Sequence, residues 1–121
     1  MSNKNKVYRV INKRNGEVLA GKVLMADSFW SRLRGLLGRE SIGEDEGLIL
    51  YPCSEIHCFG MKFNIDVIFL DREKRIISYI DDMQPGYRAR VKEATYVIEL
   101  QGGSLKKKQV RREDILVFEV I

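Results

Sequence analysis

Residues 65–70 have the sequence IDVIFL, which is apolar on both faces apart from Asp66. A short run of this kind, bounded by polar residues, predicts a buried strand. Comparable runs recur along the chain, and we expect further strands at 7–11, 17–25, 47–51, 56–59, 75–80, 94–100 and 115–121. Strands this short, with polar turns between them, favour antiparallel pairing, and the last strand is expected to pair with an early one and cover its edge.

The connections complete this expectation. Asn15-Gly16 lies between the first two strands and predicts a hairpin with a type I′ turn, in which both central residues have positive φ. One short helix is expected near residues 27–37, started by Asp27 or Ser28 and ended by Gly38, because four apolar residues there share a helical face: Phe29, Leu33, Leu36 and Leu37. The fold class is therefore α+β with β dominant, built as a strongly bent, mostly antiparallel sheet or a small barrel.

Length and composition limit the number of domains and the cell compartment. A chain of 121 residues is the size of one domain, so residues 1–121 are expected to fold as a single unit. The formal charge of +4 is the remainder of alternating blocks: residues 1–39 and 72–112 are basic, whereas residues 40–71 and 113–121 are acidic. No run has the length of a signal peptide or a membrane span, so we expect a cytoplasmic protein with free thiols at Cys53 and Cys58 and no membrane partner.

Chemically versatile residues are densest in residues 53–71, CSEIHCFGMKFNIDVIFLD. His57, the only histidine, is the natural acid–base candidate, although a structural role is the alternative. Cys53, His57 and Cys58 could supply three metal ligands, but zinc sites usually need a second pair that the chain lacks. Neither a metal nor a cofactor is therefore expected, and a cysteine nucleophile is not favoured.

Two carboxylates stand out because apolar strand residues surround them. Asp66 needs donors or a cation if it is buried, and His57, Lys62 or an arginine of the expected helix could provide them. Asp66 could then have one of two roles: it could form a structural ion pair, or it could be one half of a polar pocket. Glu99, in VIELQGG, has the same character, and the two carboxylates would form an acid pair if they converged.

Arginines flank the glycines of RLRGLLGR, residues 32–39. Guanidinium groups bind carboxylates and phosphates through two parallel hydrogen bonds, so Arg34 and Arg39 are candidates for holding an anion. The alternative is a set of surface charges near the end of a helix, where cations are favoured. The segment does not have the lysine and hydroxyl residues of a phosphate-binding loop.

Together these motifs resemble the DUF192 family, a prokaryotic family with no assigned function. The resemblance covers residues 17–121 and rests on three segments: RGLLGR at 34–39, the HCFGMK segment at 57–62 leading to Asp66, and Glu99 followed by Gly102. It implies a compact, β-rich fold with a shared polar groove, and no reaction. Relatives often have Ser or Thr where this chain has Cys58, which speaks against a thiol mechanism.

Two classes of function are compatible with these residues. The favoured class is a small binding or accessory module whose groove holds an anionic small molecule or peptide of a partner protein, with these ligand-binding candidates: Arg34, Arg39, His57, Lys62, Asp66 and Glu99. The alternative is a hydrolase-like enzyme with His57 as general base and Asp66 as its partner, which is less favoured because no nucleophile or metal set is evident. Nucleic-acid binding through residues 106–112 is weaker still, because few aromatic residues interleave with those charges.

Overall fold

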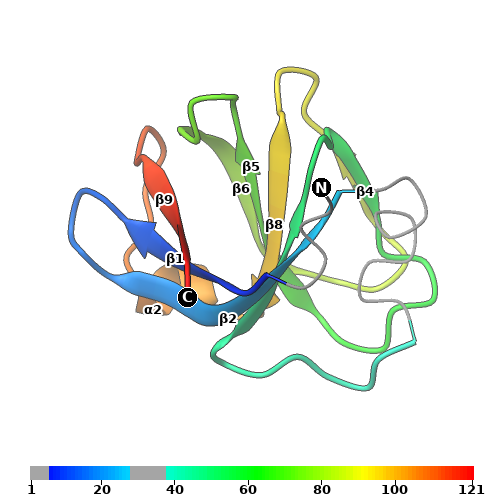
Figure 1. The fold of residues 1–121 in the computed structure, drawn as a ribbon. Coiled ribbons are helices and arrows are strands. Elements are labelled where there is room, and N and C mark those ends of the chain that lie inside the picture. Colours follow the sequence, from blue (N-terminus) through cyan, green and yellow to red (C-terminus); the bar gives the residue numbers. More distant parts are fainter. Residues whose placement is uncertain (1–5, 28–37) are drawn as a thin grey trace.

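A computed structural model describes residues 6–27 and 38–121 of the chain. The regular secondary structure of the described part is almost all β (Figure 1), with these elements: β1 (Tyr8–Asn12), β2 (Val18–Ala26), β3 (Glu46–Leu50), β4 (Glu55–His57), β5 (Ile65–Leu70), β6 (Ile76–Met83), β7 (Arg88–Arg90), β8 (Tyr96–Gln101), α2 (Ser104–Lys107) and β9 (Leu116–Val120). The expected helix at 27–37 lies, apart from Asp27, outside the described residues. Every expected strand is present, whereas β7 falls in a segment that was expected to be a loop.

Seven strands form one sheet in the order β6-β5-β8-β3-β2-β1-β9, and β4 and β7 form a second sheet of two strands. Neighbouring strands are antiparallel except for β2 and β3, which run parallel. Parallel neighbours need a long connection between them, and β2 ends at Ala26 whereas β3 begins only at Glu46. The mostly antiparallel sheet is confirmed, as is the pairing of the last strand with the first.

The large sheet curls strongly into a half-barrel (Figure 1). Its two ends meet near the start of β6, where Arg75 and Ile115 form an isolated bridge and the Leu116 N–H donates to the Lys74 carbonyl at 2.9 Å. Across the interior, the rings of Tyr96 and Phe118 meet edge to face with centroids 5.3 Å apart. The sheet is therefore closed at this end by both backbone and aromatic contacts, as the expectation of a strongly bent sheet requires.

The sheet separates two apolar cores. The inner core lies on the concave side and takes residues from both edge strands and α2, among them Val10, Val23, Ile76, Leu105 and Leu116. The outer core lies on the opposite face of β3, β5 and β8 and is covered by the two-stranded sheet, with members including Leu48, Ile56, Cys58, Val67 and Val97. IDVIFL is buried at every position because its strand lies between the two cores.

The hairpin between β1 and β2 is present, but its turn is longer than expected. The Gly16 N–H donates to the Asn12 carbonyl at 2.8 Å, and Gly16 has a φ of 72°. Asn15 is not among the residues with positive φ, so the expected type I′ turn is wrong. One left-handed glycine suffices here because the longer loop places only one residue in that conformation.

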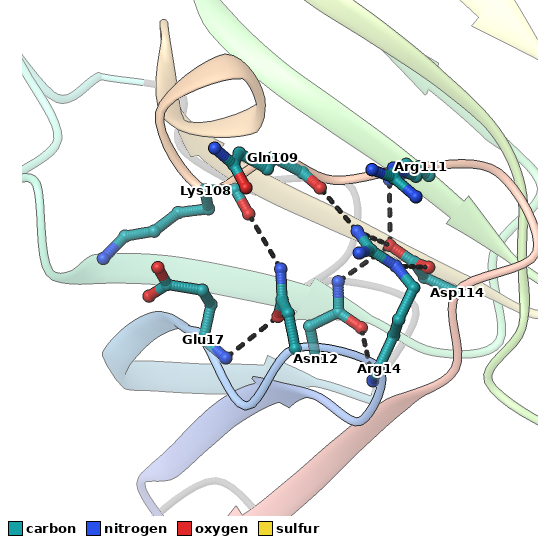
Figure 2. Close-up of polar contacts among 8 residues, drawn as sticks. Asn12, Arg14, Glu17, Lys108, Gln109, Arg111 and Asp114 are labelled. Carbon is teal, nitrogen blue, oxygen red and sulfur yellow. Dashed lines mark hydrogen bonds and ion pairs between the residues drawn. The ribbon is translucent and has the colours of Figure 1, made fainter.

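The same hairpin is fastened to the loop that follows α2 (Figure 2). The buried Asp114 carboxylate accepts hydrogen bonds from Arg14 Nε at 2.6 Å, Asn12 Nδ2 at 2.8 Å and the Arg111 N–H at 2.9 Å. Burial alone would raise the pKa of Asp114, but the hydrogen bonds from Arg14 and Asn12 outweigh it and leave the pKa below its usual value. The cluster is a structural fastening between the two ends of the chain.

Candidate ligand-binding face

The two-stranded sheet presents one polar face to solvent. The pairs Glu55 with Arg90 and His57 with Arg88 lie on that face, and all four side chains are exposed. Between them, Ile56 pairs with Ala89 and packs against the outer core. This alternation follows from the pleat, which sends successive side chains to opposite sides of a strand. We call the exposed set the β4–β7 face; it comprises Glu55, His57, Phe59, Arg88 and Arg90, and the exposed Tyr87 adjoins it at the start of β7.

Two aromatic rings, Phe59 after β4 and Tyr87 before β7, are open to solvent. Phe59 is 57% exposed and Tyr87 is 62% exposed, which is unusual for large apolar side chains. The ring of His57 stacks on Phe59 with centroids 5.6 Å apart and an interplanar angle of 29°. The Cys58 N–H donates to the Tyr87 carbonyl at 2.8 Å, so the segments carrying the two exposed rings run side by side.

Its two arginines are not neutralised. No ion pair joins Arg88 or Arg90 to any acidic side chain in the part of the chain that the structure describes. The one acidic residue of the face, Glu55, has its Oε2 atom 4.0 Å from His57 Nε2. The face therefore offers two guanidinium groups with their hydrogen-bond donors available to a ligand.

The cations expected from the sequence are placed differently. Arg39 Nη2 lies 3.2 Å from Glu46 Oε1, and Lys62 Nζ lies 2.6 Å from Glu40 Oε1. Both side chains are exposed and each has an acidic partner, so their charges are already offset. Arg34 lies outside the described residues.

Asp66 has a structural environment. It is fully buried, and its Oδ1 accepts hydrogen bonds from the N–H groups of Asp82 at 2.8 Å and Gly103 at 3.1 Å, while Oδ2 accepts from the Leu105 N–H at 2.8 Å. Asp82 has a φ of 53°, at an irregularity of β6 that turns this N–H away from the strand ladder. Backbone amides therefore hold this carboxylate in place of the expected His57 or Lys62, and the arginines of the expected helix lie outside the described residues.

Glu99 lies on the other face of the sheet. Asp66 pairs with Leu100 across β5 and β8, whereas Glu99 pairs with Val67, and paired residues share a face. Asp66 and Glu99 therefore do not converge into an acid pair, because the pleat of adjacent strands points the two carboxylates to opposite sides.

The surroundings of Glu99 are apolar. Its cross-strand neighbours are Leu48 and Val67, and its buried Oε1 has no hydrogen-bond partner among the described residues. Burial raises the pKa of Glu99 to about 7. Burial, with a contribution from Glu99, raises the pKa of the Cys58 thiol to about 11, so that thiol is protonated and a poor nucleophile.

Metal-ligating chemistry is not assembled in the described residues, where no group of three or more histidine, cysteine or acidic side chains could hold an ion. Cys53 and Cys58, both within the described part, are not joined by a disulfide, and the Cys53 thiol donates to the Glu55 carbonyl at 3.2 Å. Among the helices that the structure describes, none is both long and apolar enough to cross a membrane.

Sequence reasoning identified His57 but missed Tyr87, Arg88 and Arg90. Residues 81–92 are polar and contain Pro85-Gly86, so they were expected to form a loop. In the structure, Gly86 takes a φ of 90° and reverses the chain, and the three residues of β7 then pair with β4. The alternation of Arg88, Ala89 and Arg90 was the available signal, but it is short.

These features define a curled β-sheet domain that carries a basic, aromatic two-stranded face. The chain belongs to the DUF192 family, described as an uncharacterized ACR, whose model matches residues 10–118. It is 30% identical to a UPF0127 protein of Thermococcus kodakarensis, covering 88% of this chain and 71% of that protein. A UPF0127 protein of Thermococcus gammatolerans is 32% identical, with 92% of this chain and 75% of the relative covered.

Two solved structures share the fold. One, from Sinorhizobium meliloti and described as a candidate transcription regulator, has a TM-score of 0.81 at 21% identity and covers 93% of this chain and 92% of its own. The other is a protein of unknown function from Novosphingobium aromaticivorans, with a TM-score of 0.79 at 18% identity and coverage of 93% and 83%. At these identities the likeness concerns the fold alone. The family itself is one of unassigned function.

Proposed function

We propose that this protein is a small binding module that holds an anionic ligand on the β4–β7 face. The observation that supports it is the pair of exposed arginines, Arg88 and Arg90, which have no ion-pair partner among the described residues. Exposed guanidinium groups next to apolar rings offer both charge and contact area to an anion. The proposed ligand is anionic, as the sequence analysis expected. The cations proposed to hold it are the arginines of β7 in place of Arg39 and Lys62.

The alternative hydrolase has less support. A general base needs a group that orients it, and the sequence offered Asp66 for His57. The carboxylate oxygens of Asp66 are occupied by backbone N–H groups of Asp82, Gly103 and Leu105. The acidic group near His57 is Glu55, which is itself exposed, and a contact of 4.0 Å at the surface holds an imidazole weakly.

Nucleic-acid binding through residues 106–112 also has less support. That segment, KKKQVRR, contains no aromatic residue on which a base could stack. Lys107 is already paired with Glu44. Its remaining cations make it a suitable comparison surface for the experiment that follows.

The test is a titration of the ¹⁵N-labelled protein with sodium tripolyphosphate, followed by amide chemical shifts at low and moderate salt. We expect saturable shifts concentrated in residues 55–59 and 87–90, weakening as salt screens the charges. Arg88→Ala with Arg90→Ala should remove them. The matched control, Arg111→Ala with Arg112→Ala, deletes the same charge elsewhere and should bind as the parent does. Equal losses in both double variants would overturn the proposal, because binding would then follow net charge alone.

We also place this activity in the cytoplasm. The support is chemical: Cys53 and Cys58 lie five residues apart and are not joined by a disulfide. Thiols persist in that state in a reducing compartment. Thiol labelling of protein rapidly quenched from its native cells should find both cysteines reduced, and an oxidised pair would contradict this placement.

A further inference from the structure

We propose that the ligand of the β4–β7 face is single-stranded nucleic acid, whose bases stack on Phe59 and on the adjoining Tyr87 and whose phosphates contact Arg88 and Arg90. This inference rests on the proposed anion-binding function and names its ligand class. It differs from the nucleic-acid hypothesis drawn from residues 106–112, because it uses another surface and a different set of contacts.

The first step of the argument is the exposure of the rings. A ring that serves only the core is buried, yet Phe59 and Tyr87 leave more than half of their surface in solvent. The backbone bond from Cys58 to Tyr87 keeps the two ring-bearing segments adjacent, and His57 supports Phe59 from one side by stacking. Flat rings presented in this way are the platforms on which unpaired bases stack, with little dependence on base identity.

The second step is the spacing of the charges. Arg88 and Arg90 are two residues apart on one strand, which separates them by about 6.7 Å along the strand and places both on the exposed side. Adjacent phosphates of an extended single strand are separated by a similar length. Each arginine can therefore meet a different phosphate of the same strand. Planar guanidinium groups are well suited to phosphate oxygens.

The third step distinguishes a single strand from the other anions. The bases of a duplex are stacked on one another, so their faces are not free to meet exposed rings, whereas the unpaired bases of a single strand are. An acidic peptide would use the arginines but would leave the two exposed rings without a partner. Only a ligand that alternates flat rings with anions uses both.

One residue of the face opposes this ligand. Glu55 lies opposite Arg90 and places a carboxylate beside His57, so it repels a nearby phosphate. Its removal should therefore strengthen binding without adding any contact. Glu55→Gln is therefore expected to raise the affinity, whereas the substitutions of the rings and arginines are expected to lower it.

The experiment measures binding of three probes by fluorescence anisotropy at fixed low salt: hexathymidylate, an abasic hexamer with the same phosphates, and hexaglutamate. We expect hexathymidylate to bind at least tenfold more tightly than the abasic hexamer, because each stacked base contributes about 1–3 kcal/mol, or roughly 5- to 150-fold. If the abasic hexamer or hexaglutamate binds as tightly as hexathymidylate, the nucleic-acid inference is overturned while anion binding stands. If no probe binds, both proposals fail.

Variants assign the contacts. Phe59→Leu and Tyr87→Leu should each weaken hexathymidylate binding about tenfold and leave the abasic hexamer unchanged. The matched control is Tyr51→Leu, another exposed ring, which stacks on Tyr96 away from the face and should have no effect. Glu55→Gln should tighten binding of all three probes. Unchanged hexathymidylate binding in both ring variants would refute stacking, and circular dichroism would establish that each variant is folded.

The salt dependence of binding gives an independent measure of how many phosphates the arginines contact. Each phosphate contact with a single strand contributes about 0.7 to the slope of log K against log salt concentration. Arg88→Ala with Arg90→Ala should therefore make the slope for hexathymidylate shallower by about 1.4. The control pair at Arg111 and Arg112 should leave the slope unchanged. A slope unaffected by the β7 pair would show that these arginines do not meet the phosphates.

Discussion

Glu99→Gln should make the protein more stable at neutral and alkaline pH while changing little in acid. The folded protein holds the Glu99 carboxyl in an apolar environment with its pKa raised to about 7, from an ordinary value of 4.5. Between these two values the folded state binds more protons than the unfolded chain. The free energy of unfolding therefore falls as pH rises across that window, and above it the loss is complete. Glutamine has similar shape and no charge, so the variant escapes this loss.

The magnitude follows from the pKa change. At 1.36 kcal/mol for each pKa unit, the rise from 4.5 to about 7 corresponds to about 3 kcal/mol of stability lost in the parent between acid and pH 8. For a domain of this size a change of that order moves the melting temperature by roughly 10 °C. The thiol of Cys58 does not add to this within the window, because its own pKa lies near 11.

Urea unfolding of the parent and the variant, at several pH values from 5 to about 8.5, measures this difference. Other groups titrate in the same range in both proteins, so the quantity to compare at each pH is the unfolding free energy of Glu99→Gln minus that of the parent. Glu93→Gln, at an exposed position, is the control and should track the parent. If the difference between Glu99→Gln and the parent stays constant with pH, the carboxyl is not held protonated by burial, and the reasoning fails.

Three further predictions concern the framework. Asp66→Asn should lower the unfolding free energy by about 3 kcal/mol in urea, because an amide offers one acceptor oxygen where the carboxylate serves three N–H groups; an unchanged midpoint would contradict this. Asp114→Asn should cost about 2 kcal/mol at pH 7 through its contact with Arg14. Since the pKa of Asp114 is lowered in the folded state, that cost should shrink as pH falls below its ordinary 3.8, and a cost independent of pH would argue against the ion pair. Phe118→Leu should cost about 1 kcal/mol through the lost ring contact with Tyr96, and it should speed amide exchange in β9; unaltered exchange would show that the contact does not close the half-barrel.

The strand pattern could be predicted because burial leaves a strong signature. IDVIFL is apolar on both faces because two cores enclose its strand, and its boundaries were correct. The parallel pairing of β2 and β3 could not be predicted in the same way. It depends on how a long crossover returns to the sheet, which no local pattern encodes. The turn at Asn15-Gly16 shows the same limit, since the dipeptide indicated a hairpin and left open how many residues the loop would take.

The candidate site was only partly predictable. His57 was identified by its residue type, but the direction of each carboxylate depends on register, and a shift of one residue exchanges the two faces of a sheet. Asp66 and Glu99 were therefore grouped although they lie on opposite sides. Arg88 and Arg90 were missed because three residues of strand contain too little alternation to stand out from a polar loop.

The two-stranded sheet has a consequence for how members of this family could diverge. Its attachment to the rest of the molecule depends mainly on the inward side chains of Ile56 and Ala89, whereas Glu55, His57, Arg88 and Arg90 point to solvent. Exposed positions away from structural contacts usually tolerate substitution with changes in stability of about 0.5 kcal/mol or less. Natural selection could therefore exchange the chemistry of this face residue by residue while the half-barrel behind it stays the same. Under the proposed function, relatives with the same fold need not share a ligand, and the residues at these four positions would be a better guide to the ligand than overall similarity.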